Sequence, residues 1–135
     1  MALAVLDTSA FLAVFKNEPG ADKVTAVMHD CLMSSVNVAE VHTKLSEWGM
    51  PDTLRDHAFA LIPARIVDFD GAQARMTGTL RPDTKRLGLS LGDRACLALA
   101  LREDLPALTS DRAWGQLSQA GDGRAGSAAK VVLIR

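Results

Sequence analysis

The sequence predicts an α/β fold, a three-layer α/β/α sandwich around a mostly parallel central sheet. Residues 2–6 and 131–134 are uninterrupted apolar runs, the pattern of strands that are buried on both faces. Segments with helical spacing separate these runs from one another. With 135 residues, 48 % of them apolar and 23 % charged, residues 1–135 are expected to form one globular domain.

The first half of the chain alternates strands and helices. In order, we expect a strand at residues 2–6, helices at 10–15 and 21–29, a strand at 31–33, and helices at 36–48 and 52–61. Residues 16–20 contain Pro and Gly and are expected to turn between the first two helices. Within residues 36–48, Val38, Val41 and Leu45 recur at intervals of three and four, which is typical of an amphipathic helix.

The second half continues this alternation. In order, we expect a strand at residues 65–69, a helix from about 71 to 80, a polar loop at 81–89, a helix at 91–103, a strand at 106–109, a turn into a helix at 110–114, a flexible loop at 121–127 and a buried strand at 131–134. Asp70 and Ser90 precede two of these helices and are expected to cap them.

Composition and charge exclude several classes of protein. The net charge of −1 gives no global basic field of the kind that marks tight non-specific DNA binding. No apolar run is long enough to cross a bilayer, and the N-terminus lacks the basic region and cleavage site of a signal peptide. Cys31 and Cys96 lie in apolar patterns and are expected to be reduced core residues of a cytoplasmic protein.

Four acids are expected to meet at one edge of the sheet. Asp7 ends the first strand, Asp93 lies in the first turn of one helix, Glu40 lies one turn into another, and Asp111 follows another strand. Strand ends and the helix starts that follow them share one side of a parallel sheet. Gathered carboxylates either take up protons or bind a cation. Oxygen ligands without His or Cys suit Mg²⁺ or Mn²⁺, and this chemistry serves the hydrolysis of phosphodiester bonds.

Each acid also has a purely structural interpretation. Asp7 and Asp111 are placed to stabilise the start of the helix that follows each of them. Asp93 stands three residues after Ser90, the spacing of a capping box. Glu40 has the character of a solvated helix residue. Taken together, these interpretations do not explain why all four acids fall at the same sheet edge.

Four ordered motifs resemble those of the PIN-domain family. They are VLDTSA at residues 5–10, SVNVAEV at 35–41, LGDRACLALA at 91–100 and LTSDRAW at 108–114. The likeness spans essentially the whole chain, so the resemblance implies a PIN-like fold, and it is nearest to the VapC-type toxins of bacterial type II toxin–antitoxin systems. It implies a Mg²⁺- or Mn²⁺-dependent endoribonuclease in which Asp7, Glu40, Asp93 and Asp111 are the catalytic and metal-binding residues.

The same resemblance implies supporting residues and partners. Thr8, Ser9 and Thr109 fall where the family carries small polar residues that support the ligands. A homodimer is implied, and so is a protein antitoxin that covers the acidic pocket. Independently of the resemblance, a set of basic side chains has the chemistry to bind RNA phosphates, with a solvated surface as the alternative. These residues are Arg81, Lys85, Arg86, Arg94 and Arg112.

Three other functions remain open. A receiver-like signalling domain also binds Mg²⁺ in an acidic pocket, but it would need an acid pair at the first strand end and a lysine after the last strand. A phosphotransferase of the haloacid dehalogenase type would need a second Asp at the position of Ser9. A non-catalytic PIN module that binds RNA or acts as a scaffold would keep the fold without the activity.

Overall fold

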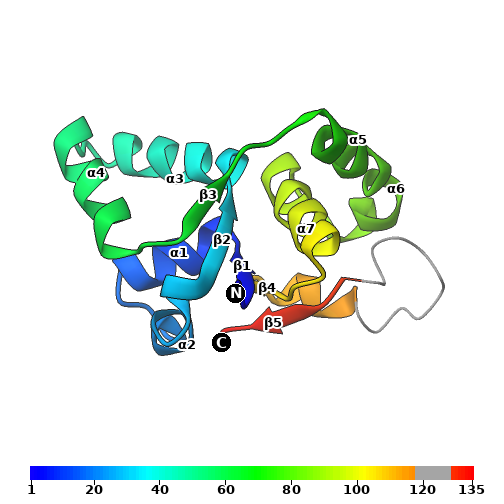
Figure 1. The fold of residues 1–135 in the computed structure, drawn as a ribbon, viewed down its shortest axis with the longest axis horizontal. Helices are drawn as coiled ribbons and strands as arrows, with labels where there is room; N and C mark the ends of the chain where they lie inside the picture. The colour runs from blue at the N-terminus through cyan, green and yellow to red at the C-terminus, as the bar shows by residue number, and fades with distance from the viewer. Residues whose placement is uncertain (118–128) are drawn as a thin grey trace.

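A parallel sheet lies between two groups of helices in the computed structural model, which describes residues 1–117 and 129–135 (Figure 1). The strands are β1 (Ala4–Leu6), β2 (Cys31–Ser34), β3 (Arg65–Val67), β4 (Ala107–Thr109) and β5 (Val131–Leu133). The α-helices are α1 (Thr8–Phe15), α2 (Ala21–Thr25), α3 (Ser35–Glu47), α4 (Asp52–Leu61), α5 (Gly71–Thr79), α6 (Arg81–Thr84) and α7 (Leu91–Glu103). Short 3₁₀ segments are η1 (Met28–Asp30), η2 (Lys85–Leu87) and η3 (Arg112–Gln116). The expected three-layer α/β/α fold is confirmed.

The five strands run in the order β3-β2-β1-β4-β5, and every neighbouring pair is parallel. The chain moves outward from β1 in one direction to β2 and β3, and later returns to the other side of β1 with β4. Ligands of open α/β sheets bind beyond the strand ends at such a reversal. Receiver domains have the order 2-1-3-4-5 instead, so the strand order argues against the receiver-like alternative.

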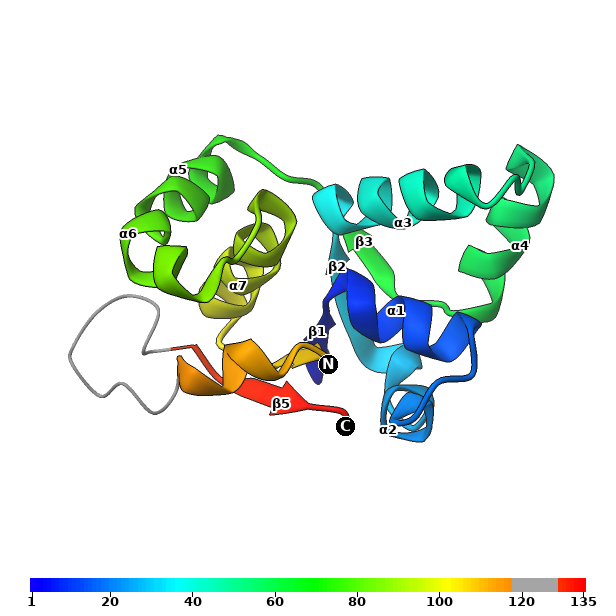
Figure 2. The same cartoon turned by 180° about the vertical axis from the view of Figure 1, so that it is seen from behind.

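Alternate strand residues supply two apolar cores, one on each face of the sheet. Leu6 and Met33 pack with α1, α3 and α4, where Phe11 is fully buried. Val5 and Leu32 face the other way and pack with α7 and η3. The two helical groups stand on opposite sides of the sheet in both views (Figures 1 and 2). The period of two in a strand therefore feeds both cores.

Two expectations about individual elements are wrong. Residues 81–89 are not a polar loop throughout, because residues 81–87 form α6 and η2. Proline is well accommodated in a first helical turn, and Pro82 occupies one here. The run at 131–134 is not buried throughout, because β5 is an edge strand among the described residues and Val132 is 42 % exposed.

Other differences from the expected elements are smaller. The first strand begins at Ala4 instead of Ala2, and before it the Leu3 N–H donates to the Asp30 carbonyl at 2.7 Å. The helix expected at 21–29 ends at Thr25, and η1 follows it. The expected Asp70 cap is confirmed, since its Oδ1 accepts from the Gln73 N–H at 2.9 Å. The loop expected at 121–127 lies outside the described residues.

Two further findings concern the cysteines and the possibility of a membrane-spanning helix. Cys31 and Cys96 are both buried and free, as expected. Within residues 1–117 and 129–135, no helix has the length and apolarity needed to span a membrane.

Candidate functional site

The Asp7 carboxylate is buried at the carboxyl end of the central strand β1. Only 3 % of the residue is exposed. Its Oδ2 accepts hydrogen bonds from Ser9 Oγ at 2.7 Å and Thr109 Oγ1 at 2.9 Å, whereas its Oδ1 is buried without a partner among the described residues. Asp7 stands at the N-cap position of α1 but makes no side-chain cap bond. Asp7 therefore occupies the expected cap position without the side-chain bond of a cap.

Hydrogen bonds bring the segments of the other acids to this position. Thr8 bonds Glu40, Asn37 bonds the Gly92 carbonyl beside Asp93, and Thr109 bonds both Asp7 and the Asp111 N–H. Burial raises the pKa of Asp7 to about 6, and the charge of Asp93 adds to the rise, while hydrogen bonds from Ser9 and Thr109 oppose it. Burial also raises the pKa of Asp93, and the charges of Glu40 and Asp111 contribute to that rise. These charge contributions to the pKa values of Asp7 and Asp93 agree with the contacts between the segments. The segments that the sequence places at one sheet edge do meet there.

Hydroxyl groups connect the ends of β1 and β4. Ser9 Oγ and Thr109 Oγ1 lie 3.1 Å apart while both bond to Asp7. Ser9 Oγ also accepts from the Ser110 N–H at 3.0 Å, and Thr109 Oγ1 accepts from the Asp111 N–H at 3.1 Å. The two hydroxyls that bond the side chain of Asp7 thus also bond the main chain after β4, Ser9 at Ser110 and Thr109 at Asp111.

Glu40 is held by hydrogen bonds from two other polar side chains. Its Oε1 accepts from Thr8 Oγ1 at 2.7 Å and from Asn37 Nδ2 at 3.2 Å. The sequence analysis did not single out Asn37, which is fully buried. The available signal was a polar residue one turn before Glu40, on a face of α3 where Val41 and Leu45 are buried. Glu40 is therefore more than a solvated helix residue.

Asp93 and Asp111 also have the structural roles that were considered for them. Asp93 Oδ2 accepts from the Ser90 N–H at 2.8 Å and Ser90 Oγ accepts from the Asp93 N–H at 3.2 Å, which completes a capping box at the start of α7. Asp111 Oδ1 accepts from the Ala113 N–H at 3.0 Å and caps η3. Each of these bonds uses one oxygen of its carboxylate.

The donor set fits a hard divalent cation, although the cage is not preformed. Among residues 1–117 and 129–135, no three His, Cys, Asp or Glu side chains are already grouped as metal ligands. Mg²⁺ commonly keeps several waters and takes only one or two carboxylates, so it does not need such a group. The unpartnered Oδ1 of Asp7 is a buried anionic oxygen, which is costly unless a proton or a cation compensates it.

The basic residues separate into two groups. Arg94 Nη1 donates to the Thr77 carbonyl at 3.0 Å and Arg81 Nη1 donates to the Leu89 carbonyl at 3.2 Å, so both help to hold the helices on that side of the sheet. Lys85, Arg86 and Arg112 are exposed. Of these, Arg112 follows Asp111 directly.

Two hollows open beside the acids. One, of about 590 Å³, is lined by Pro19, Ser110, Asp111, Arg112 and Arg135. Arg135 was not among the expected basic residues. It follows the last strand, and the sequence does not reveal that this position lies near Asp111. The other hollow, of about 280 Å³, runs along α3 beside Glu40 and Lys44.

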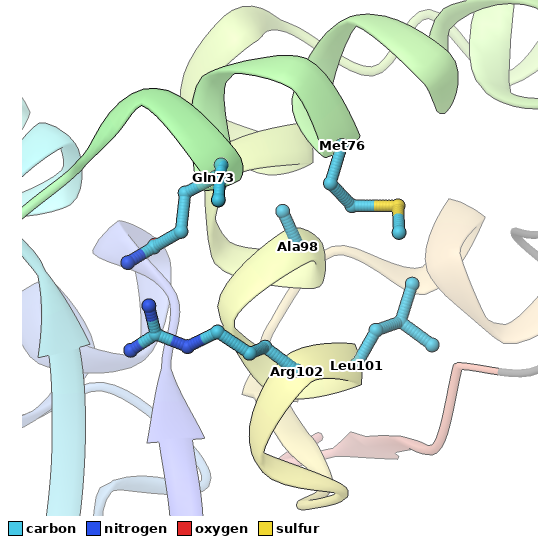
Figure 3. A pocket seen from close by; sticks show the side chains of 6 residues that line it. Gln73, Met76, Ala98, Leu101 and Arg102 are labelled. Carbon is cyan, nitrogen blue, oxygen red and sulfur yellow. The ribbon is translucent and has the colours of Figure 1, made fainter.

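A third cavity, of about 260 Å³, lies away from these hollows between α5 and α7 (Figure 3). Figure 3 shows Met76 and Leu101 on one side of it, and Gln73 and Arg102 on the other. Its lining contains none of the four acids, so it is not part of the candidate site.

The fold and these residues define an α/β protein with an acidic site at the switch point of a parallel sheet. A sequence model of the PIN domain matches residues 4–119. The chain belongs to the PIN domain family, as the motif resemblance implied. Among curated protein sequences, none matches the chain.

Several solved structures have the same fold. A toxin–antitoxin complex from Klebsiella pneumoniae aligns with a TM-score of 0.68 at 22 % identity and covers 98 % of each chain. DNA-bound VapBC from Salmonella typhimurium aligns with a TM-score of 0.67 at 15 % identity over 100 % of each chain. FitAcB from Neisseria gonorrhoeae aligns with a TM-score of 0.67 at 18 % identity over 98 % of each chain. At these identities, the likeness shows the fold.

Proposed function

We propose that the protein is a metal-dependent endoribonuclease of the VapC toxin type, with Asp7, Glu40, Asp93 and Asp111 as its metal-binding and catalytic residues. The observation that carries this proposal is the buried Asp7 carboxylate, which has one unpartnered oxygen and lies close enough to Asp93 for their charges to repel. Mg²⁺ is the proposed cofactor, with Mn²⁺ as a substitute, because the available donors are oxygens.

In this proposal, Asp7, Glu40, Asp93 and Asp111 would hold the ion, whose chemistry when bound would be to activate water and to stabilise negative charge on a phosphodiester oxygen. The chain supplies the positioning. Ser9 and Thr109 fix one oxygen of Asp7 by hydrogen bonds and leave the other oxygen for the ion. The start of α7 lies at the same place, and the partial positive charge of a helix N-terminus eases the crowding of negative charge around Asp93.

RNA is proposed to enter through the hollow beside Asp111. Arg112 and Arg135 line this hollow and have the charge to bind phosphate oxygens on either side of the scissile bond. Lys85 and Arg86 are exposed and are proposed as further phosphate contacts. Arg81 and Arg94 are proposed to act mainly by holding their segments, because their guanidinium groups bond main-chain carbonyls.

The partners follow from the proposed toxin type. The aligned structures from Klebsiella pneumoniae and Salmonella typhimurium are toxin–antitoxin assemblies, which supports a protein antitoxin as the inhibitor of this chain. A homodimer and a location in the cytoplasm are proposed with it. The free thiols of Cys31 and Cys96 agree with a reducing compartment.

A non-catalytic PIN module that binds RNA is the second candidate. One observation favours it: in the part of the chain that the structure describes, no three acidic side chains form a ready metal group. The two candidates differ in whether the protein cuts RNA when Mg²⁺ or Mn²⁺ is present.

Cleavage of RNA by the purified protein separates these functions. We expect cleavage with Mg²⁺ or Mn²⁺, none after chelation, and a loss of about a hundredfold or more for Asp7→Asn and for Asp93→Asn. Asp22→Asn is the matched control, because Asp22 is an exposed acid in α2 and its change should leave the rate unaltered. Intact RNA under every metal condition would favour the non-catalytic module. Equal cleavage by Asp7→Asn and the wild type would contradict the role given to Asp7.

The toxin assignment has its own test in cells. Expression of the chain alone should arrest growth, and co-expression with its antitoxin should relieve the arrest. Mapping the ends of cleaved RNA then identifies the target. Growth arrest without new RNA ends would argue for a toxin that works by another mechanism.

A further inference from the structure

Asn37 lies at the centre of the contacts that hold Glu40. Its Nδ2 lies 3.2 Å from Glu40 Oε1, 3.1 Å from Thr8 Oγ1 and 3.0 Å from the Gly92 carbonyl. An amide NH₂ carries two hydrogens, so these three acceptors share them. Through one side chain, the first turn of α3 is tied to the starts of α1 and α7.

The amide of Asn37 is not the side chain that would best stabilise the fold at this position. The residue is fully buried, and its Oδ1 has no hydrogen-bond partner among the described residues. A buried polar atom without a partner costs free energy that an apolar side chain of similar shape avoids. What the amide offers here is its pair of N–H donors, and one of their acceptors is the Glu40 carboxylate.

Gly92 completes this arrangement by having no side chain. A Cβ at Gly92 would overlap both oxygens of the Glu40 carboxylate. Glycine inside a helix is less favourable than alanine, and Gly92 lies in the first turn of α7. The carboxylate of Glu40 therefore occupies the space that a side chain at Gly92 would take, next to Asp93.

We infer that Asn37 is a positioning residue for the cation site: it donates to Glu40 Oε1 and holds the carboxylate over Gly92, beside Asp93. This inference rests on the proposed function, since it gives Asn37 a role in cation binding through Glu40. Thr8 Oγ1 donates to the same Oε1 at 2.7 Å, so both hydrogen bonds fall on one oxygen of Glu40.

A double-mutant cycle on Mn²⁺ affinity tests the inference without any need for RNA cleavage. Asn37→Leu keeps the approximate volume and removes the donors. We expect it to weaken Mn²⁺ binding in calorimetry by about 10- to 100-fold, the usual effect of losing a group that orients a ligand. In the Glu40→Ala background, Asn37→Leu should cause little further loss, because Asn37 acts through Glu40. Equal losses in both backgrounds would overturn the inference.

Gln73→Leu is the matched control. Gln73 is also a buried amide with an unpartnered oxygen, but its Nε2 donates to the Asp68 carbonyl at 2.9 Å, in the approach to α5. Its change should leave Mn²⁺ affinity within about twofold of the wild type. An equal loss in Gln73→Leu would mean that any buried amide has this effect, and the inference would fail. Asn37→Ser, which should also weaken binding, serves if Asn37→Leu does not fold.

The same variants, unfolded by urea in the presence of chelator, separate this inference from the proposed function. If Asn37 and Glu40 are bonded, Asn37→Leu should change the unfolding equilibrium constant about fivefold more with Glu40 present than in Glu40→Ala. A wild type that binds no Mn²⁺ would overturn the cation site itself, and with it the role given to Asn37. Coupled unfolding would then still establish the Asn37–Glu40 bond.

Discussion

Asp7 is a carboxylate whose ionisation opposes folding in the absence of a cation. Its pKa rises from 3.8 to about 6 in the folded protein, chiefly because the group is buried. The folded state therefore keeps its proton over a range of pH in which the unfolded chain has lost it. The contribution of Asp7 to stability is greatest below about pH 4 and is lost as the pH rises through about 6.

This difference predicts a pH-dependent stability for the metal-free protein. From pH 4 to pH 7.5, Asp7 alone should lower the free energy of unfolding by on the order of 3 kcal/mol. Urea unfolding of the wild type and of Asp7→Asn in chelator, at both pH values, measures the effect as the change in their difference. Parallel curves for the two proteins would contradict it.

Mg²⁺ should reverse the loss in the wild type. At pH 7.5, added Mg²⁺ is expected to raise the unfolding free energy of the wild type, because a cation that binds only the folded state stabilises it. It should do much less for Asp7→Asn. Under the proposed function, ionisation of Asp7 therefore lowers the stability of the metal-free protein, and cation binding raises the stability again.

At the scale of elements, α7 contributes both to a core and to the acidic site. Its body, from Ala95 to Ala100, is buried in the second core, and its first turn carries Gly92 and Asp93 into the acidic site. The capping box of Ser90 and Asp93 fixes where the helix begins. The position of the acidic residue therefore depends on the cap as well as on the packing of the helix.

Ser90→Ala tests the contribution of this cap. Loss of the hydroxyl that accepts from the Asp93 N–H should lower the free energy of unfolding by about 1 kcal/mol. Ser46→Ala is the control, since Ser46 is an exposed residue near the end of α3 and its change should stay within a few tenths of a kcal/mol. The two variants are compared by urea unfolding at one pH. Equal effects would argue that the Ser90 hydroxyl adds nothing to α7.

At the scale of the whole molecule, the C-terminal end of the chain closes against its beginning. Gly20, between α1 and α2, has φ of +93°, and a Cβ there would overlap the Ile134 carbonyl oxygen. The Ile134 N–H donates to the Thr109 carbonyl at 2.9 Å, which carries the line of β5 past its last paired residue. Residues more than a hundred positions apart in sequence therefore determine which residue is allowed at position 20.

Gly20→Ala and Gly49→Ala separate this contact from backbone strain. Gly49 also has a positive φ, of +81°, but a Cβ there meets nothing within 4 Å. Each alanine should cost about 1–2 kcal/mol for its left-handed conformation. Gly20→Ala should cost about 1–3 kcal/mol more because of the overlap with main chain. Equal losses in the free energy of unfolding, measured in urea, would show that a side chain at position 20 does not clash with Ile134.

Much of this molecule is predictable from local patterns. The helix at 91–103 and its Ser90 cap agree with the structure, because apolar spacing and capping residues act within a few positions. The edge position of β5 was not predictable, because an apolar run does not show which strands have two neighbours. The folding of residues 81–87 into α6 and η2 was not predicted. These residues are mostly polar, and their composition did not reveal that Pro82 lies in the first turn of a helix.

For the candidate site, the four acids and the sheet edge at which they should meet were predictable from local patterns, since the carboxyl ends of parallel strands share one side. How each acid is held depends on the folded chain. It gave Asp7 one unpartnered oxygen, used one oxygen each of Asp93 and Asp111 in caps, and brought Asn37 and Gly92 to Glu40. Those contacts join segments far apart in the chain, and no local pattern encodes which buried polar atoms will find partners.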